Sequence, residues 1–392
     1  MFFKTKSSVQ FIVTVICACL LVQLGISHKL WLPMGREFPI ISAFEFFNFH
    51  YGVILDGILY SFAVVSLIAI FFLPFNKLLV YTLVFVFSLL ILEDIMRLQP
   101  WFYLFCIMLI TVAVYGKDKQ EQILFVFRII LAATYFWSGF QKFNHAFTVE
   151  IFPWLMNPMG LETFFEQHHR LAYIVPLIEL SAGLGFLFKR LQKPAGLVLI
   201  LIHLMLLYSL GPWASNWNIL IWPWNLAMII IIWVIIRQNS YKGIIESIKP
   251  LKKSVWLGFV CLLTFIMPAF NFIGYWDYYL SGSLYSGNIP EAIFYYDKNN
   301  TDVHLTSVQY SQVYYPEKSG EYLVIDAWAL AELKTPVYPE DRYFKRIGNL
   351  LCNKTRGKSG TGYLIISKKR FTSELQQENC KCYSITNSPS GN

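Results

Sequence analysis

About nine apolar stretches of membrane-crossing length lie between residues 8 and 273. A spanning helix needs about 20 mostly apolar residues. We place spans at 8–27, 51–74, 77–92, 100–115, 123–141, 171–188, 194–211, 218–236 and 255–273. Only 14% of the 392 residues are charged, against about 25% in a soluble domain. The sequence therefore predicts an all-α polytopic membrane bundle over residues 1–280, with the bilayer as its solvent.

Charge and aromatic residues separate the two ends of this bundle. Lys and Arg accumulate in cytoplasmic loops, and Trp gathers at membrane interfaces. With the N-terminus inside, the inside loops hold Lys4, Lys6, Lys77, Lys117, Lys119, Lys189, Arg190 and Lys193 and five more cations in 237–253. The opposite loops are rich in Trp. We predict a bacterial inner-membrane protein with a cytoplasmic N-terminus; the first apolar run is long and lacks an A-x-A site, which favours an uncleaved span over a signal peptide.

The net charge of +8 is explained by this loop bias together with a basic tail. No array of basic and aromatic residues indicates a nucleic-acid partner. Membrane lipid is the expected environment of residues 1–280.

Residues 285–392 differ in character from the rest of the chain. Alternating segments (VHLTSVQY, EYLVIDAWAL and GYLIISKK) predict strands, and KRIGNLL predicts a short helix. An odd number of spans places this small α+β domain outside the cytoplasm, where disulfides form. We expect Cys352 to pair with Cys380 or Cys382, although a Cys-x-Cys pair also suits metal binding or disulfide exchange. The domain is a candidate contact for an envelope protein.

Ionisable residues inside spans usually face a bundle interior or a cavity. In the fifth span, Arg128, Tyr135 and Lys142 recur every seven residues and so share one helix face. Gly139 permits close approach of another helix. Lys142 is either a lysine that snorkels to the interface or a base beside an apolar pocket. His145 is either its proton-sharing partner or a loop residue.

Further polar candidates lie at or within other spans. Glu93, Asp94 and Arg97 form a compact charged group, which is either a rim salt bridge or part of a ligand site. Glu179 lies roughly 12 Å into its span at ~1.5 Å per residue, so it is protonated or paired. His203 is either a buried, hydrogen-bonded histidine or a ligand or proton relay, and a single His gives no metal-site spacing.

These groups lead to one geometric hypothesis. We expect seven of them to converge on a single cavity that opens to the extracytoplasmic side: Asp56, Glu93, Asp94, Arg97, Lys142, His145 and Glu179. Tyr135 and His203 complete the expected ligand-binding set.

Two segments carry family resemblances. YFWSGFQKFNHAF (135–147) resembles the transmembrane module of the vitamin K-dependent γ-glutamyl carboxylases and the wider HTTM group, and Lys142 falls on the lysine regarded there as the base. PLIELSAGLGFLFKR (176–190) is similar to the DoxX/MauE membrane proteins. Gln141, Asn144 and Phe147 stand where the carboxylases have Lys, Asp and Trp, and the tail is smaller than their lumenal region. The resemblance implies a bundle with a cavity for a lipid-like ring compound, with a quinone as cofactor.

Three functions follow from these features. The first is an accessory or maturation protein of an envelope complex, which displays its tail to a partner. The second is a quinone-linked, carboxylase-like or redox enzyme that uses Lys142 as base and His145 beside it. The third is a transporter, which is disfavoured because internal repeats and Gly/Pro-broken spans are scarce.

Overall fold

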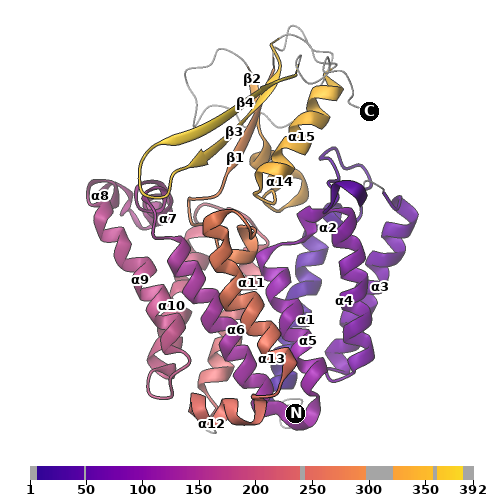
Figure 1. Cartoon of the computed structure of the whole chain (residues 1–392), viewed down its shortest axis with the longest axis vertical. Helices are drawn as coiled ribbons and strands as arrows, with labels where there is room; N and C mark the ends of the chain where they lie inside the picture. Colours follow the sequence, from indigo (N-terminus) through magenta and orange to yellow (C-terminus); the bar gives the residue numbers. More distant parts are fainter. Residues whose placement is uncertain (1–6, 48–49, 239–242, 297–320, 356–359, 383–392) are drawn as a thin grey trace.

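A computed structural model describes residues 7–47, 50–238, 243–296, 321–355 and 360–382. A helix occupies each predicted apolar stretch (Figure 1). The helices of the predicted stretches are α1 (Ser8–Ile26), α3 (Val53–Phe72), α4 (Lys77–Glu93), α5 (Pro100–Tyr115), α6 (Gln120–Gln141), α9 (Ile174–Gly185), α10 (Gln192–Leu210), α11 (Ile221–Ile236) and the shorter α13 (Val255–Cys261). Short helices α2 (His28–Trp31), α7 (Phe152–Met156), α8 (Glu162–Gln167) and α12 (Ile244–Ile248) lie at the two ends of the bundle.

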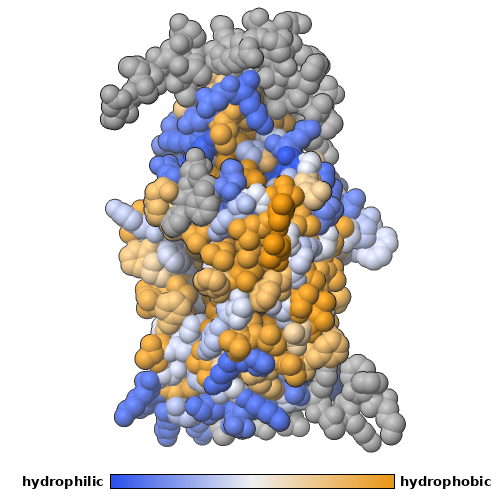
Figure 2. All heavy atoms as spheres, turned by 90° about the vertical axis from the view of Figure 1, so that its right-hand side faces the viewer, coloured by the Kyte–Doolittle hydropathy of each residue, from blue (hydrophilic) through white to orange (hydrophobic). Residues whose placement is uncertain are grey.

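Five helical segments of the described chain are long and apolar enough to cross a membrane. They are Ser8–Ile26, Val53–Phe72, Lys117–Gln141, Gln192–Leu210 and Val255–Ile273. Figure 2 shows a broad apolar surface between two hydrophilic ends. The prediction of a mostly helical membrane bundle is confirmed, whereas the count of about nine spans is not.

The last bundle segment changes its helix type along its length. After α13 the backbone becomes a π-helix, η8 (Leu262–Ile266), and then a 3₁₀ segment, η9 (Met267–Ile273). Pro268 lies near the start of η9, and a proline cannot donate the hydrogen bond that continues an α-helix. The segment ends at Gly274, which adopts a left-handed conformation with φ of 76°.

The C-terminal part is a small sheet with two helices. Its antiparallel strands follow the order β2-β1-β3-β4, where β1 is Glu291–Tyr296, β2 Glu321–Val324, β3 Gly362–Lys368 and β4 Leu375–Lys381. Helices α14 (Ile325–Leu333) and α15 (Asp341–Lys354) accompany it. Gly348 of α15 lies against the ring of Tyr363 in β3, where a Cβ atom would come within 2.4 Å of that ring. The helix therefore packs tightly on the sheet.

Some of the strands and helices predicted for this part are confirmed and others are not. The strand prediction for GYLIISKK is confirmed by β3, and KRIGNLL lies inside the longer α15. The strand prediction for EYLVIDAWAL is wrong after its fourth residue, because α14 begins at Ile325. The segment VHLTSVQY lies outside the described residues. Cys352 of α15 is bonded to Cys382, and Cys380 is outside the disulfide.

The sheet sits on the end of the bundle opposite the N-terminus (Figure 1). The Glu332 carboxylate accepts hydrogen bonds from the backbone N–H groups of Glu37 and Phe38. A second attachment lies at the end of α6. There the Arg370 guanidinium donates to Gln141 Oε1 at 2.5 Å, and the His145 N–H donates to the Arg370 carbonyl at 2.7 Å. The domain is thus attached directly to the end of α6 that carries Lys142.

Candidate functional site

Helices α6 and α9 approach each other through two glycines. A Cβ atom at Gly139 would lie 2.7 Å from the backbone N of Leu180, and one at Gly183 would lie 2.8 Å from the backbone N of Phe136. Any larger residue would therefore push the helices apart. The predicted close approach at Gly139 is confirmed, and it brings the end of α6 beside Glu179 of α9.

Lys142 and Glu179 form an ion pair at this contact. Lys142 Nζ lies 2.6 Å from Glu179 Oε2 and donates to Ser138 Oγ at 2.9 Å. The Lys142 side chain is 12% exposed and that of Glu179 is 5% exposed. An ammonium carries three N–H donors, so one remains for a further acceptor.

A second polar chain crosses from α6 to α10 and α11. Tyr135 OH lies 2.5 Å from His203 Nε2, and His203 Nδ1 lies 2.6 Å from Asn225 Oδ1. The amide of Asn225 donates from Nδ2 to the Ile221 carbonyl, which leaves its oxygen facing the histidine. Because that oxygen can only accept, Nδ1 carries the imidazole proton in the neutral ring. The Tyr135 hydroxyl therefore donates to Nε2.

Both chains line one cavity between α6, α9, α10 and α11. Its polar lining includes Thr134, Tyr135, Ser138, Lys142, Glu179, His203 and Asn225; the apolar lining includes Phe147, Phe152, Leu155 and Trp224. The space open to the centre of a water molecule is about 70 Å³. A water needs at least about 10–15 Å³ of such space, and benzene fits a cavity of about 150 Å³. The cavity as it stands therefore holds a few waters and is about half the size that benzene needs.

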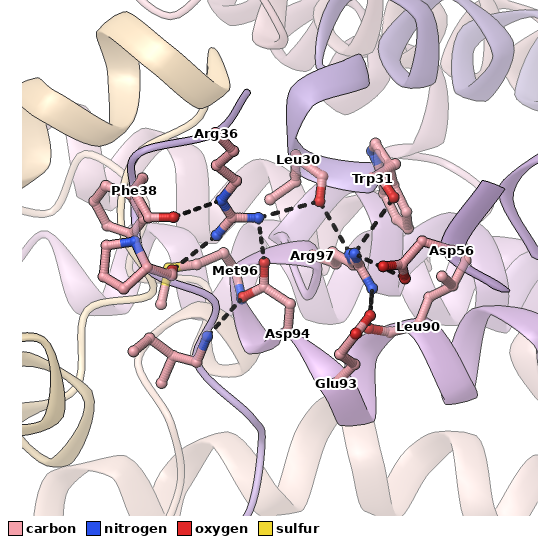
Figure 3. A network of polar contacts seen from close by, with 12 residues as sticks. Leu30, Trp31, Arg36, Phe38, Asp56, Leu90, Glu93, Asp94, Met96 and Arg97 are labelled. Carbon is pink, nitrogen blue, oxygen red and sulfur yellow. Dashed lines mark hydrogen bonds and ion pairs between the residues drawn. The ribbon is translucent and has the colours of Figure 1, made fainter. Parts of the chain in front are cut away.

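A separate charged cluster surrounds Arg97 at the end of α4 (Figure 3). Its Nη1 lies 2.9 Å from Glu93 Oε2, and its Nη2 lies 3.6 Å from Asp56 Oδ1. The backbone carbonyls of Leu30, Trp31 and Leu90 accept the remaining hydrogen bonds of this guanidinium. Arg97 is fully buried, and every one of its nitrogens has an oxygen partner.

Arg36 extends this cluster toward the sheet. Its Nη1 lies 2.6 Å from Asp94 Oδ2, and its other nitrogens donate to the carbonyls of Phe38 and Pro39. The loop that Arg36 holds in place is the loop whose backbone donates to Glu332 of the C-terminal domain. The Arg97 cluster, defined as Arg36, Asp56, Glu93, Asp94 and Arg97, is therefore a support for that domain.

The predicted convergence of seven groups on one cavity is wrong. Lys142 and Glu179 line the cavity together with Tyr135 and His203, whereas the members of the Arg97 cluster do not. His145 is also absent from the lining, and its ring lies 6.4 Å from that of His169. The charges separate because Lys142 is held by the α6–α9 contact, while Glu93 and Asp94 end a helix that packs on α3 and α5.

Ser138 was not among the predicted site residues. Asn225 and Trp224 lie in an aromatic segment, GPWASNWNILIWPWNLAM, whose sequence is consistent either with the mouth of a pocket for a flat apolar ligand or with an interfacial belt. Only the pairing of α10 with α11 shows that Asn225 faces His203. Within the described ranges, no group of three or more His, Cys, Asp or Glu side chains is placed to hold a metal ion.

Residues 123–211 match the DoxX family. This segment runs from α6 through α10 and contains Tyr135, Lys142, Glu179 and His203, so the match covers most of the cavity's polar lining. The DoxX match and the apolar helices indicate an integral membrane protein. No curated protein and no solved structure matches the chain. The DoxX-like part of the predicted resemblance is confirmed, and the carboxylase and HTTM part is not.

Proposed function

We propose that this membrane protein binds a small oxygen-bearing ring compound, of the quinone or phenol class, in the cavity beside Lys142. The observation that carries the proposal is a pair of hydrogen-bonded couples, Lys142–Glu179 and Tyr135–His203, on the wall of one mostly apolar cavity, which a second cavity of similar volume adjoins. Ligand sites are mostly apolar concavities with a few convergent polar groups. This cavity has that composition.

The hydrogen bonds assign different tasks to the two couples. Lys142 already donates to a carboxylate and a hydroxyl, so it acts as a charged donor to a ligand oxygen. The Tyr135–His203 couple is better suited to exchange a proton, because its imidazole Nε2 accepts the phenol hydrogen bond. The proposal therefore replaces the predicted Lys142 base with Lys142 as an anchor, and it gives His145 no contact with the ligand.

The proposal places the protein in a bacterial inner membrane with the sheet domain outside the cytoplasm. Two features support this orientation. The N-terminus and the sheet domain lie at opposite ends of the molecule (Figure 1). The starts of α4 and α10, with Lys77 and Lys193, and the turn before α6, with Lys117 and Lys119, lie at the N-terminal end, as the positive-inside rule requires.

Titration of the purified protein tests the binding site. A benzoquinone without a side chain is added in detergent, and quenching of Trp fluorescence reports its binding, since Trp224 lines the cavity. A hydrogen bond from a charged donor contributes about 1.5–3 kcal/mol, so Lys142→Met is expected to weaken binding by about 10- to 150-fold. Lys119→Met, which removes an exposed lysine at the other end of the bundle, is the matched control and keeps full affinity. Equal affinity of wild type and Lys142→Met overturns the proposal.

A second candidate function is an accessory role in an envelope complex. It is favoured by β4, an edge strand among the described strands, whose first five residues (375–379) are exposed. Edge strands can pair with a strand of another chain. In cells, this role predicts that Lys142→Met is silent, whereas removal of residues 285–392 abolishes function. Loss of function in Lys142→Met at normal protein level favours the ligand-binding role.

A further inference from the structure

A second cavity lies directly beside the first. It too offers about 70 Å³ to the centre of a water molecule, and it shares four lining residues with the first cavity: Thr134, Ser138, Trp224 and Leu284. The second cavity contains no charged side chain in its lining. It lies between α5, α6 and the η8–η9 segment, so the two cavities flank the same stretch of α6.

One wall of the second cavity is the irregular segment that faces the bilayer. Thr264 of η8 and Pro268 of η9 line it from that side, while Leu262, Ile266 and Phe270 of the same segment are exposed. Only 22% of the span Val255–Ile273 is buried. A single layer of π-helical and 3₁₀ backbone therefore separates this cavity from lipid, and π-helices are frequent at functional sites.

The end of both cavities toward the sheet domain is covered by protein. Residues 279–285 form this roof, and Gly282, at φ of 74°, presses on α6 so closely that a Cβ atom would lie 3.1 Å from Ser138 N. The sheet domain holds the preceding residues in place. Glu340 accepts from the Tyr278 N–H at 2.7 Å, and Tyr338 donates to Asp277 at 2.9 Å.

Two buried donors at the second cavity lack a partner within the described part of the chain. They are Tyr103 OH and Trp224 Nε1. Buried polar groups are almost always hydrogen-bonded, and an orphan in a native protein calls for an explanation. Since Trp224 lines both cavities, its N–H is available to an acceptor at their junction.

We infer that the ligand is a membrane-borne ring compound with a hydrocarbon chain, which places its ring beside Lys142 and its chain through the second cavity toward the lipid. The inference rests on the proposed function and specifies its ligand class. The roof over the cavities and the lipid-facing wall favour a ligand that enters from the membrane over a water-soluble one. Trp224, which lines both cavities, donates to a second oxygen of the ring at their junction.

Chain length is the variable that tests this inference. The chainless benzoquinone and the same ring with a ten-carbon chain are titrated in one detergent into wild type and into a variant with a filled second cavity, Ala133→Leu. Ala133 is fully buried and lines only this cavity of the two. Ala269→Leu is the matched control, because it adds the same atoms to an exposed position on the same wall. Thr264→Leu fills the cavity from the other side if Ala133→Leu does not fold.

Burial of two or more methylene groups predicts that wild type and Ala269→Leu prefer the chain-bearing ring by about tenfold or more. Ala133→Leu and Thr264→Leu should bind the chainless ring normally and lose that preference. If the preference survives in the filled variants, or if wild type has none, the inference is overturned while the proposed site stands. If wild type binds neither ring, the proposed function fails and the inference fails with it.

Discussion

The Arg97 cluster and the Lys142 cavity are both buried and charged, yet they differ in one respect. In the cluster, two guanidinium groups are surrounded by three carboxyl groups and by backbone carbonyls, and the residues of the cluster do not line the cavity. In the cavity, Lys142 keeps one N–H donor without an acceptor among the described residues, and the cavity walls enclose a space that no described side chain fills. Charge burial alone therefore does not select a candidate site. Unused hydrogen-bonding capacity beside an empty volume does.

The difference also explains how the two regions cooperate. The Arg97 cluster fixes the loop on which Glu332 of the sheet domain sits. The sheet domain in turn holds the roof over the cavity through Asp277 and Tyr278. Hydrogen bonds thus link the Arg97 cluster, through the sheet domain, to the residues that precede the roof of the proposed binding site.

The largest expected effect is on folding, from Arg97→Leu. It leaves Glu93 and Asp56 buried without their cation, which costs about 3–5 kcal/mol when one partner of a buried pair is removed. We expect little monodisperse protein in size-exclusion chromatography and a sharply lowered thermal midpoint. Arg190→Leu, at an exposed turn, is the control and should unfold like wild type. Normal stability of Arg97→Leu would contradict a supporting role.

A smaller effect on folding, with a large effect on binding, is expected from Lys142→Met. The Lys142 side chain is 12% exposed and that of Glu179 5%, whereas those of Arg97 and Glu93 are fully buried, so water screens part of the charge that is left on Glu179. We expect a loss of stability below about 2 kcal/mol together with the loss of ligand affinity. Parallel thermal unfolding and titration separate the two. A collapse in stability equal to that of Arg97→Leu would show that the two regions are alike.

Tyr135→Phe sharpens the comparison within the cavity. The variant removes one hydrogen bond to His203 and keeps the ring, so the free energy of unfolding should fall by about 0.5–1.5 kcal/mol. Ligand affinity should change less than in Lys142→Met. Proton exchange with a bound phenol, followed through the pH dependence of binding, should disappear. An unchanged pH profile in Tyr135→Phe contradicts the proton-exchange role of the couple.

The smallest effect concerns Glu340, whose carboxyl group accepts the Tyr278 N–H just before the roof of the cavities. Burial, and next the nearby Asp277 charge, raise the pKa of Glu340 from 4.5 to about 8. The folded protein therefore keeps a proton there that the unfolded chain releases, so this stabilisation is full below pH 4.5 and is lost as pH rises through 8. From about pH 6 to about pH 9 the thermal midpoint of wild type should fall more than that of Glu340→Gln. Parallel profiles would contradict the raised pKa.

The length of the apolar stretches predicted the main helices of the bundle, but not the short helices α2, α7, α8 and α12. It did not predict the change of α13 to a π-helix, where Trp137 donates to the Phe265 carbonyl from the neighbouring helix. In the C-terminal part, EYLVIDAWAL alternates like a strand, yet Asp326 lies in α14 and accepts the Val337 N–H. Both places involve contacts between residues far apart along the chain, which local patterns do not contain.

The residues of the site were also predicted only in part, because contacts between distant residues bring them together. The spacing of Tyr135 and Lys142 and the depth of Glu179 correctly selected cavity residues. The spacing of Glu93, Asp94 and Arg97 on the third apolar stretch could not show that backbone carbonyls from α2 would satisfy the arginine. The sequence indicates which charged residues are buried. Which of them keep an unused hydrogen-bond donor depends on the helices that pack against them.

The most direct measurement is mass spectrometry of small molecules extracted from the purified protein, with Lys142→Met purified in parallel. We predict a chain-bearing ring compound with oxygen substituents, near one molecule per chain in wild type and strongly depleted in the variant. Equal amounts in the two proteins, or no such compound in wild type of full stability, would contradict the account.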